Sequence, residues 1–259
     1  MHVFQSLMSV SLALLAMMAW RYSHTITCFS LILPVAAMIM IAVPSARFTI
    51  ARRQCFANCF FVPGSFLHGW FQRKTVSIFI AVALAALGTF SLMLSLVTWE
   101  TSILTAIAID GLIVATIAPR LLLLGTSQLR PEMASLAARA TLANTNALAI
   151  VAPLLWLQFN EPIPDFVDRE NSLGRTILNA TAIYSSNCAV IDQVLWLNAV
   201  KESFSWWLVN LANANLSDPN YRLAAWLAFL SSSLPSAWAF SRLIVEVSFQ
   251  SQPHGGRND

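Results

Sequence analysis

The sequence holds few of the residues that soluble enzymes use for chemistry. Of its 259 residues only 10% are Asp, Glu, Lys or Arg, and His and Cys occur four times each. It contains no HExxH, GxSxG or P-loop motif, so metalloproteases, serine hydrolases and nucleotide-driven proteins lack their characteristic residues. The sequence therefore favours a protein that is not an enzyme, and it indicates no catalytic residue.

The histidines are too dispersed to hold a cofactor. A haem with two axial imidazoles needs both at the same depth in a bundle. Only His24 and His68 lie near apolar segments, and the predicted topology places them on opposite sides, while His2 and His254 are terminal. We expect no haem, metal or other cofactor.

The cysteines do not form a recognisable disulfide framework. Cys28 begins an apolar run, Cys55 and Cys59 follow it in a basic interval, and Cys188 stands alone in the longest polar interval. A Cys-x3-Cys pair without a second pair of ligands is a weak zinc signal. Buried or lipid-facing thiols are the simpler interpretation.

Charge is scarce because long apolar runs make up most of the chain. The sequence is 57% hydrophobic, with a mean hydropathy of +0.66, and a helix needs about 20 apolar residues to cross the hydrocarbon core. Five nearly uncharged runs have about this length: Val3–Trp20, Ile26–Val43, Val76–Thr98, Ile103–Leu124 and Ala137–Phe159. The predicted fold class is all-α, a polytopic transmembrane helical bundle of five to six spans with an amphipathic helical segment on its outer face.

These runs predict four parts: a five-span membrane domain (1–159), an extracytoplasmic amphipathic segment (160–222), a sixth span (223–249) and a polar tail (250–259). No charge occurs between Arg222 and Arg242, which leaves enough apolar chain to cross. Four serines and a proline interrupt this run, however. The alternative is five spans followed by a helix on the outer face.

The distribution of basic residues predicts the orientation. Positive charge is retained on the cytoplasmic side of a membrane. The interval between the second and third runs has five bases and no acid: Arg47, Arg52, Arg53, Arg73 and Lys74. The loop EPIPDFVDRE, directly after the fifth run, has one base, Arg169, and four acids: Glu161, Asp165, Asp168 and Glu170. We therefore predict a multi-pass protein of a bacterial inner membrane with its N-terminus in the cytoplasm.

The outer segment carries a helical pattern from Ile183 to about Leu211. Apolar residues recur every three or four positions: Val190, Val194, Leu197, Val200, Phe204, Trp207 and Leu211. Because Asp192, Lys201 and Glu202 fall on the opposite side, we predict a helix parallel to the membrane with its tryptophans near the headgroups. A lid across the ends of the spans, direct lipid contact and partner docking remain alternatives for its role.

The candidate polar positions inside the spans are Asp110, Arg139, Asn144 and Asn146. An acid within a bilayer must be neutral, paired or facing water, so Asp110 in the fourth span suggests function by default. Asn144 in the fifth span is expected about 10 Å deeper than Asp110, too far for direct contact. These residues serve either as hydrogen-bonding ties between helices or as the lining of a transport path.

Two functions follow from this pattern. The first is a non-catalytic integral membrane subunit of a larger membrane assembly, such as a secretion or conjugation complex. The alternative is a small transporter or channel that uses Asp110 and the polar face of span five. The expected partners are the lipid bilayer and other membrane proteins or further copies of the chain. Nucleic acid is not expected, because the net charge of +3 comes from scattered bases.

Overall fold

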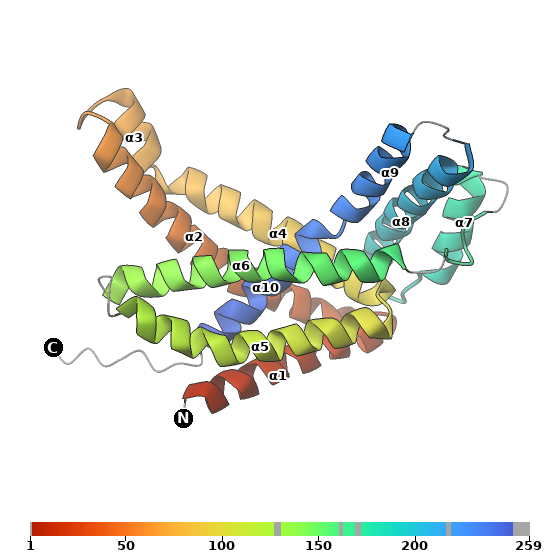
Figure 1. Ribbon diagram of the computed structural model, residues 1–259, viewed down its shortest axis with the longest axis horizontal. Helices are drawn as coiled ribbons and strands as arrows, with labels where there is room; N and C mark the ends of the chain where they lie inside the picture. Colours follow the sequence, from red (N-terminus) through yellow and green to blue (C-terminus); the bar gives the residue numbers. More distant parts are fainter. Residues whose placement is uncertain (1, 127–130, 161–162, 169–171, 216–218, 251–259) are drawn as a thin grey trace.

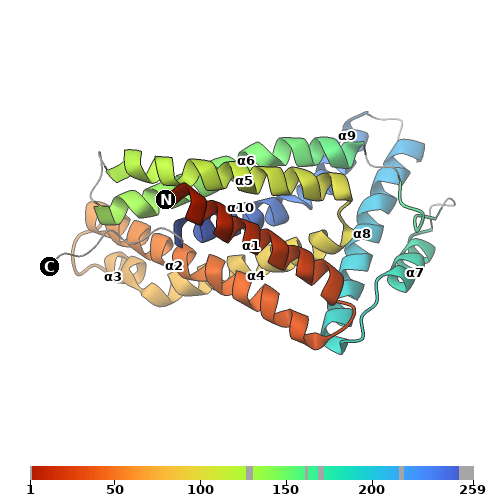
Figure 2. The same cartoon turned by 90° about the horizontal axis from the view of Figure 1, so that it is seen from below.

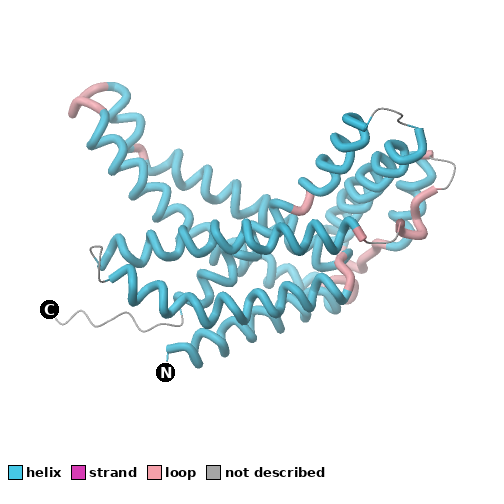
Figure 3. Tube along the Cα trace, in the orientation of Figure 1, coloured by secondary structure: helices cyan, strands magenta, loops and turns pink. Residues whose placement is uncertain are grey.

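The computed structural model describes residues 2–126, 131–160, 163–168, 172–215 and 219–250. Within these ranges the chain forms helices and contains no strand, which confirms the predicted all-α class (Figure 1 and Figure 3). In chain order the helices are α1 (His2–Ser23), η1 (Cys28–Leu31), α2 (Ile32–Phe60), α3 (Phe66–Gln72), α4 (Lys74–Thr98), α5 (Thr101–Thr126), α6 (Pro131–Phe159), α7 (Leu173–Ile183), α8 (Ala189–Asn215), α9 (Pro219–Ser231) and α10 (Leu234–Gln250). The predicted tail lies outside the described residues except for Gln250.

Six helical segments are long and apolar enough to cross a membrane: Val3–Ser23, Cys28–Phe60, Lys74–Thr98, Thr101–Leu121, Ser135–Gln158 and Arg222–Gln250. The first five contain most of each apolar run predicted from the sequence. The sixth is interrupted, because α9 ends at Ser231 and α10 begins at Leu234. The chain is thus consistent with a multi-pass integral membrane protein whose last candidate span is a broken helix.

Helix α10 lies at the centre of the bundle. It packs against α1, α2, α4, α5 and α6, which surround it in both views (Figure 1 and Figure 2). A continuous stretch of α10, from Ala239 to Phe249, is buried. On the α4 side the approach is close, because a Cβ added to Gly88 would lie 2.9 Å from the ring of Trp238. Glycine here lets the two helices come together.

The basic interval is helical over most of its length. Arg47, Arg52 and Arg53 lie within α2, which continues to Phe60, where the sequence analysis expected a loop after Val43. No helix-terminating signal follows Pro44 until Pro63-Gly64, and Gly64 has a φ of +86° that favours glycine. The turn between α2 and α4 is therefore short and holds α3.

Helices α7, α8 and α9 form a cap at the opposite end from α3. Figure 2 shows α8 running across the ends of the other helices. A second apolar core holds this cap together, formed by Phe166, Val167, Ala180, Ala199, Trp206, Val209 and Phe229. Helix α8 contributes to both cores, because Ala199, Trp206 and Val209 lie in the core of the cap and Ile191 and Leu195 lie in the core of the bundle.

The predicted apolar positions of α8 are covered only in part by the rest of the chain. Ile191, Leu195 and Trp206 are buried. Val190, Leu197 and Phe204, three of the predicted apolar positions, are 57%, 53% and 49% exposed in the isolated chain. These three residues recur every seven positions and so share one face. We refer to them as the outer stripe.

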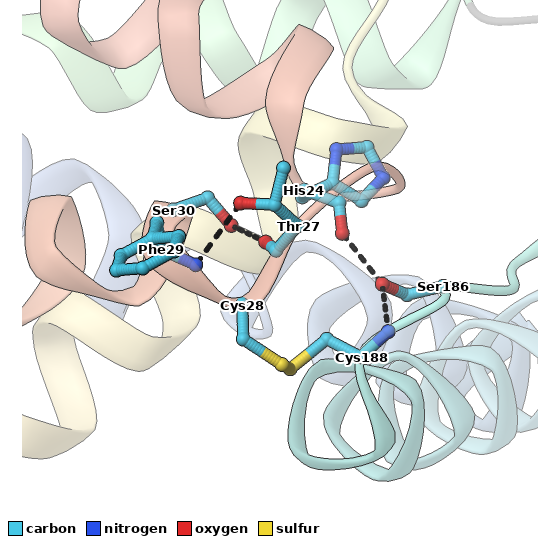
Figure 4. Close-up of a disulfide and its surroundings, with 7 residues drawn as sticks. All are labelled: His24, Thr27, Cys28, Phe29, Ser30, Ser186 and Cys188. Carbon is cyan, nitrogen blue, oxygen red and sulfur yellow. Dashed lines mark hydrogen bonds between the residues drawn. A yellow bond between two sulfur atoms is a disulfide. The ribbon is translucent and has the colours of Figure 1, made fainter.

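A disulfide joins the cap to the bundle, which corrects the expectation of unpaired cysteines. Cys28 at the start of η1 is bonded to Cys188 just before α8, and 160 positions separate them in the chain (Figure 4). Beside it, Ser186 Oγ donates a hydrogen bond of 2.6 Å to the backbone oxygen of His24 (Figure 4). The two cysteines meet only because the turn after α1 and the loop before α8 lie at the same end of the bundle.

Arg21 of α1 lies at the same end of the bundle, beside the carboxyl end of α4. Its Nη1 donates hydrogen bonds of 2.8 Å to the backbone oxygen of Leu96 and 2.6 Å to that of Trp99. The last carbonyl groups of a helix have no partner within the helix and attract cations. Arg21 therefore caps the carboxyl end of α4.

Candidate functional site

Polar side chains occur on α10 although the helix is enclosed by its neighbours. Ser236, Ser241, Arg242 and Glu246 are all buried. Charged residues are expensive inside a membrane and need partners there. Their partners come from α4 and α6, and Asn146 of α6 in turn links α10 to Asp110 of α5.

Glu246 pairs with Arg139 of α6. Arg139 Nη1 donates a hydrogen bond of 2.9 Å to Glu246 Oε2, and the Glu246 side chain is only 3% exposed. The Arg139 guanidinium also lies 5.2 Å from the ring centroid of Phe249, within the range of a cation–π contact. This is a charge-compensated pair between the central helix and α6.

Asn146 links the acid of α5 to α10. Its Nδ2 donates hydrogen bonds of 2.9 Å to Asp110 Oδ2 and 3.1 Å to Ser241 Oγ. Asn146 is buried and Asp110 half-buried. One amide group thus joins α5, α6 and α10.

The depth estimate placed Asn144 too far from Asp110 for direct contact, and Asn144 bonds instead to Arg242. Asn146, two residues further along α6, does reach Asp110, so the polar stretch of span five is not wholly separate from this acid. That estimate measured depth from the outer end of each apolar run and assumed that the two helices end level. Asp110 is nine residues from the start of α5 and Asn146 is thirteen from the end of α6. At 1.5 Å per residue the outer ends of the two helices are therefore offset by about 6 Å, which brings Asn146 to Asp110.

Asn144 lies on a different side of α6 and meets Arg242. Arg242 Nη2 donates a hydrogen bond of 3.2 Å to Asn144 Oδ1, and its guanidinium carbon lies 5.8 Å from the ring centroid of Trp238. Both residues border a cavity of about 700 Å³ between α2, α4, α6 and α10. Asn144 is itself exposed, so this part of α6 faces the cavity and the surroundings rather than Asp110.

A second polar group lies nearer the cap. Ser236 Oγ is 2.7 Å from Ser91 Oγ and 2.8 Å from Ser95 Oγ, both on α4. Gln158 of α6 exchanges hydrogen bonds of 2.7 and 2.9 Å with Ser233. These contacts satisfy polar groups at the break between α9 and α10.

Ser241, Arg242 and Glu246 were not predicted from the sequence as site residues. The predicted sixth span (223–249) contains all three residues, but none of them was among the candidate polar positions. The signal was present, because Arg242 and Glu246 are spaced four residues apart and share a helix face, with apolar residues between and after them. Such a pair inside an apolar helix indicates a buried polar site.

The arrangement is suited to holding helices together. Asp110 and Glu246 each accept a hydrogen bond from α6. Arg139 and Arg242 each contact one polar and one aromatic partner. Two guanidinium groups are not fully satisfied, because Nε of Arg139 and Nε of Arg242 are buried without a partner. Among the described residues no group of three His, Cys, Asp or Glu side chains could hold a metal ion.

Comparison of the chain with protein-family models, curated protein sequences and solved structures found no match.

Proposed function

We propose that this protein is a non-catalytic integral membrane subunit of a larger membrane assembly, such as a secretion or conjugation complex of a bacterial inner membrane. Its buried polar groups support this role, because they pair with one another across α5, α6 and α10. Paired groups of this kind fix the positions of helices. The bundle is then a rigid support for the surfaces that meet other subunits.

The outer stripe of α8 is the observation that carries the proposal. Val190, Leu197 and Phe204 lie on one face of a helix whose other side is already packed, and the neighbouring Trp196 is 52% exposed. Aromatic and large apolar side chains exposed together on a rigid element are typical of protein interfaces. The Cys28–Cys188 disulfide anchors this helix to the bundle, which would reduce the entropic cost of binding.

The disulfide also supports the proposed orientation. Disulfides persist in oxidising compartments such as the periplasm, and this one lies at the cap end. The basic residues of α2 and α4 lie near α3, at the other end. Positive-inside bias and the location of the disulfide thus independently support a cytoplasmic α3 and a periplasmic cap.

Purification from the native membrane in mild detergent tests the proposal. We expect a complex larger than the 28.5 kDa chain, with a membrane protein partner or further copies at fixed stoichiometry. Replacing all three residues of the outer stripe by serine should release the partner while the Cys28–Cys188 bond still forms. Leu178→Ser, at a 69% exposed position of α7 in the same cap, is the matched control. A monomeric wild-type chain, or a complex that the triple variant leaves intact, would contradict the proposal.

A small transporter or channel is the second candidate. It is favoured by four ionisable residues inside the bundle, Asp110, Arg139, Arg242 and Glu246, since such residues often mark ion or proton paths. Reconstitution into liposomes with a trapped pH-sensitive dye tests it. Proton flux that is lost in Asp110→Asn would support transport, whereas absence of flux in the wild type would leave the subunit role as the better explanation.

A further inference from the structure

Two cavities meet along one side of α2. The first, of about 700 Å³, lies between α2, α3 and α6 and includes Phe56, Phe60 and Phe71 in its wall. The second, also of about 700 Å³, lies between α2, α4, α6 and α10 and includes Leu84, Leu87 and Leu234. Phe48, Thr49 and Arg52 line both. The two cavities therefore form a continuous groove with Arg52 at their junction.

The wall of this groove is apolar, and its charges are all positive. Among the residues that the structure describes, Arg52, Arg53 and Arg242 line it and no Asp or Glu does. Arg53 is engaged with Ser77 Oγ at 3.4 Å and lies over the ring of Phe71. Arg242 is mostly buried and donates to Asn144. Arg52 is exposed and has no hydrogen-bond or ion-pair partner among the described residues, so it is the cation open to a ligand.

The position of Arg52 along α2 matches a headgroup layer. It is twenty residues from Ile32, at the cap end of α2, which corresponds to about 30 Å of helix. That is the thickness of the hydrocarbon core. The cavity that includes Leu84 and Leu87 extends from Arg52 back toward the middle of the bundle, and both leucines are open to the surroundings, at 50% and 65% exposure.

We propose that this groove binds an anionic phospholipid, with its headgroup phosphate at Arg52 and an acyl chain in the cavity between α2, α4 and α10. The charge of the groove selects the ligand, because basic pockets between spans at the cytoplasmic side suit anionic headgroups. Leu84, Leu87 and Leu234 then contact the chain. This site is separate from the outer stripe and goes beyond the subunit role, since each can be present without the other.

Lipid titration followed by native mass spectrometry of the full chain in detergent tests the site. Phosphatidylglycerol and phosphatidylcholine with identical acyl chains are the probes. We expect phosphatidylglycerol to bind about tenfold more tightly and Arg52→Gln to remove that difference, as for the loss of one charge-assisted hydrogen bond. Arg47→Gln is the matched control, because Arg47 is exposed on the same helix but lines neither cavity. It should change the affinity by less than about twofold.

Two further variants test the mode of binding. Leu84→Trp should fill the cavity for the acyl chain and weaken the binding of phosphatidylglycerol. Arg52→Lys keeps the positive charge and should retain the preference for phosphatidylglycerol over phosphatidylcholine. Equal effects of Arg52→Gln and Arg47→Gln, or equal binding of the two lipids by the wild type, would overturn the proposal. The proposal would also be overturned if Leu84→Trp bound phosphatidylglycerol as tightly as the wild type does. If inorganic phosphate alone binds as tightly as phosphatidylglycerol, the site takes free anions and the proposal is also wrong.

Discussion

Arg139 of α6 and Glu246 of α10 form an ion pair of 2.9 Å in the interior of the helix bundle. Removal of one partner leaves the other charge buried and uncompensated, which costs about 3 kcal/mol or more. We therefore expect Glu246→Ala to lower the free energy of unfolding by about this amount in denaturant titrations in micelles. Arg139→Ala combined with Glu246→Ala should cost less than the sum of the single changes. Additive costs would mean that the pair is not coupled.

Substitutions of Asp110 distinguish between the two proposed functions. If it is a tie between α5 and α6, Asp110→Asn should be mild, because the amide oxygen can still accept the hydrogen bond from Asn146. Asp110→Leu should then lower the stability of the bundle or its assembly by about 1–2 kcal/mol. Thermal unfolding in detergent and the yield of the purified complex measure both effects. Normal accumulation of Asp110→Asn with complete loss of cellular phenotype would instead favour transport.

Gly88 lets α4 approach α10. In Gly88→Ala the new Cβ would lie 2.9 Å from Trp238 Cζ3 and 3.0 Å from Ala239 Cβ, so one helix must shift. Overpacking of this kind costs about 1–3 kcal/mol, which a melting curve detects. Gly174→Ala is the control, because nothing lies within 4 Å of its added Cβ and alanine favours helix. A melting temperature unchanged by Gly88→Ala would contradict this packing.

The Cys28–Cys188 bond predicts a specific pattern of thiol modification. After denaturation without reductant, a maleimide–polyethylene glycol reagent should add to Cys55 and Cys59 only, the two free cysteines. After reduction it should add to all four. Cys28→Ser should leave three reactive thiols without reductant. Four additions to the unreduced wild type would show that the bond does not form.

Reporter fusions test the orientation. A fusion after Arg53, in the basic part of α2, should report the cytoplasm, and a fusion after Asp165, next to the cap, should report the opposite side. The same assignment from both fusions would contradict the predicted path of the chain up to Phe159. The disulfide provides a control that does not depend on charge, because it should form only on the side reported for Asp165.

The sequence by itself determined the helical class and the approximate position of each candidate span. Hydrophobicity over about 20 consecutive residues is a local property, and a helix satisfies its own backbone hydrogen bonds. Four of the polar residues that matter, Asp110, Arg139, Asn144 and Asn146, could be selected for the same reason, since polar residues stand out within apolar runs. Their partners could not be assigned. A one-turn offset between helices changes the contact distance by about 5 Å.

Contacts between segments that are distant in the chain were decided by the tertiary structure. Cys28 and Cys188 are 160 positions apart and pair because two loops meet at one end of the bundle. The covered faces of α8 were decided by two cores, because Ile191 and Leu195 pack into the core of the bundle whereas Trp206 packs into the core of the cap. Arg242 and Glu246 became interior residues because five helices enclose α10. Helical periodicity tells which residues share a face, but only the neighbouring elements determine which face is covered.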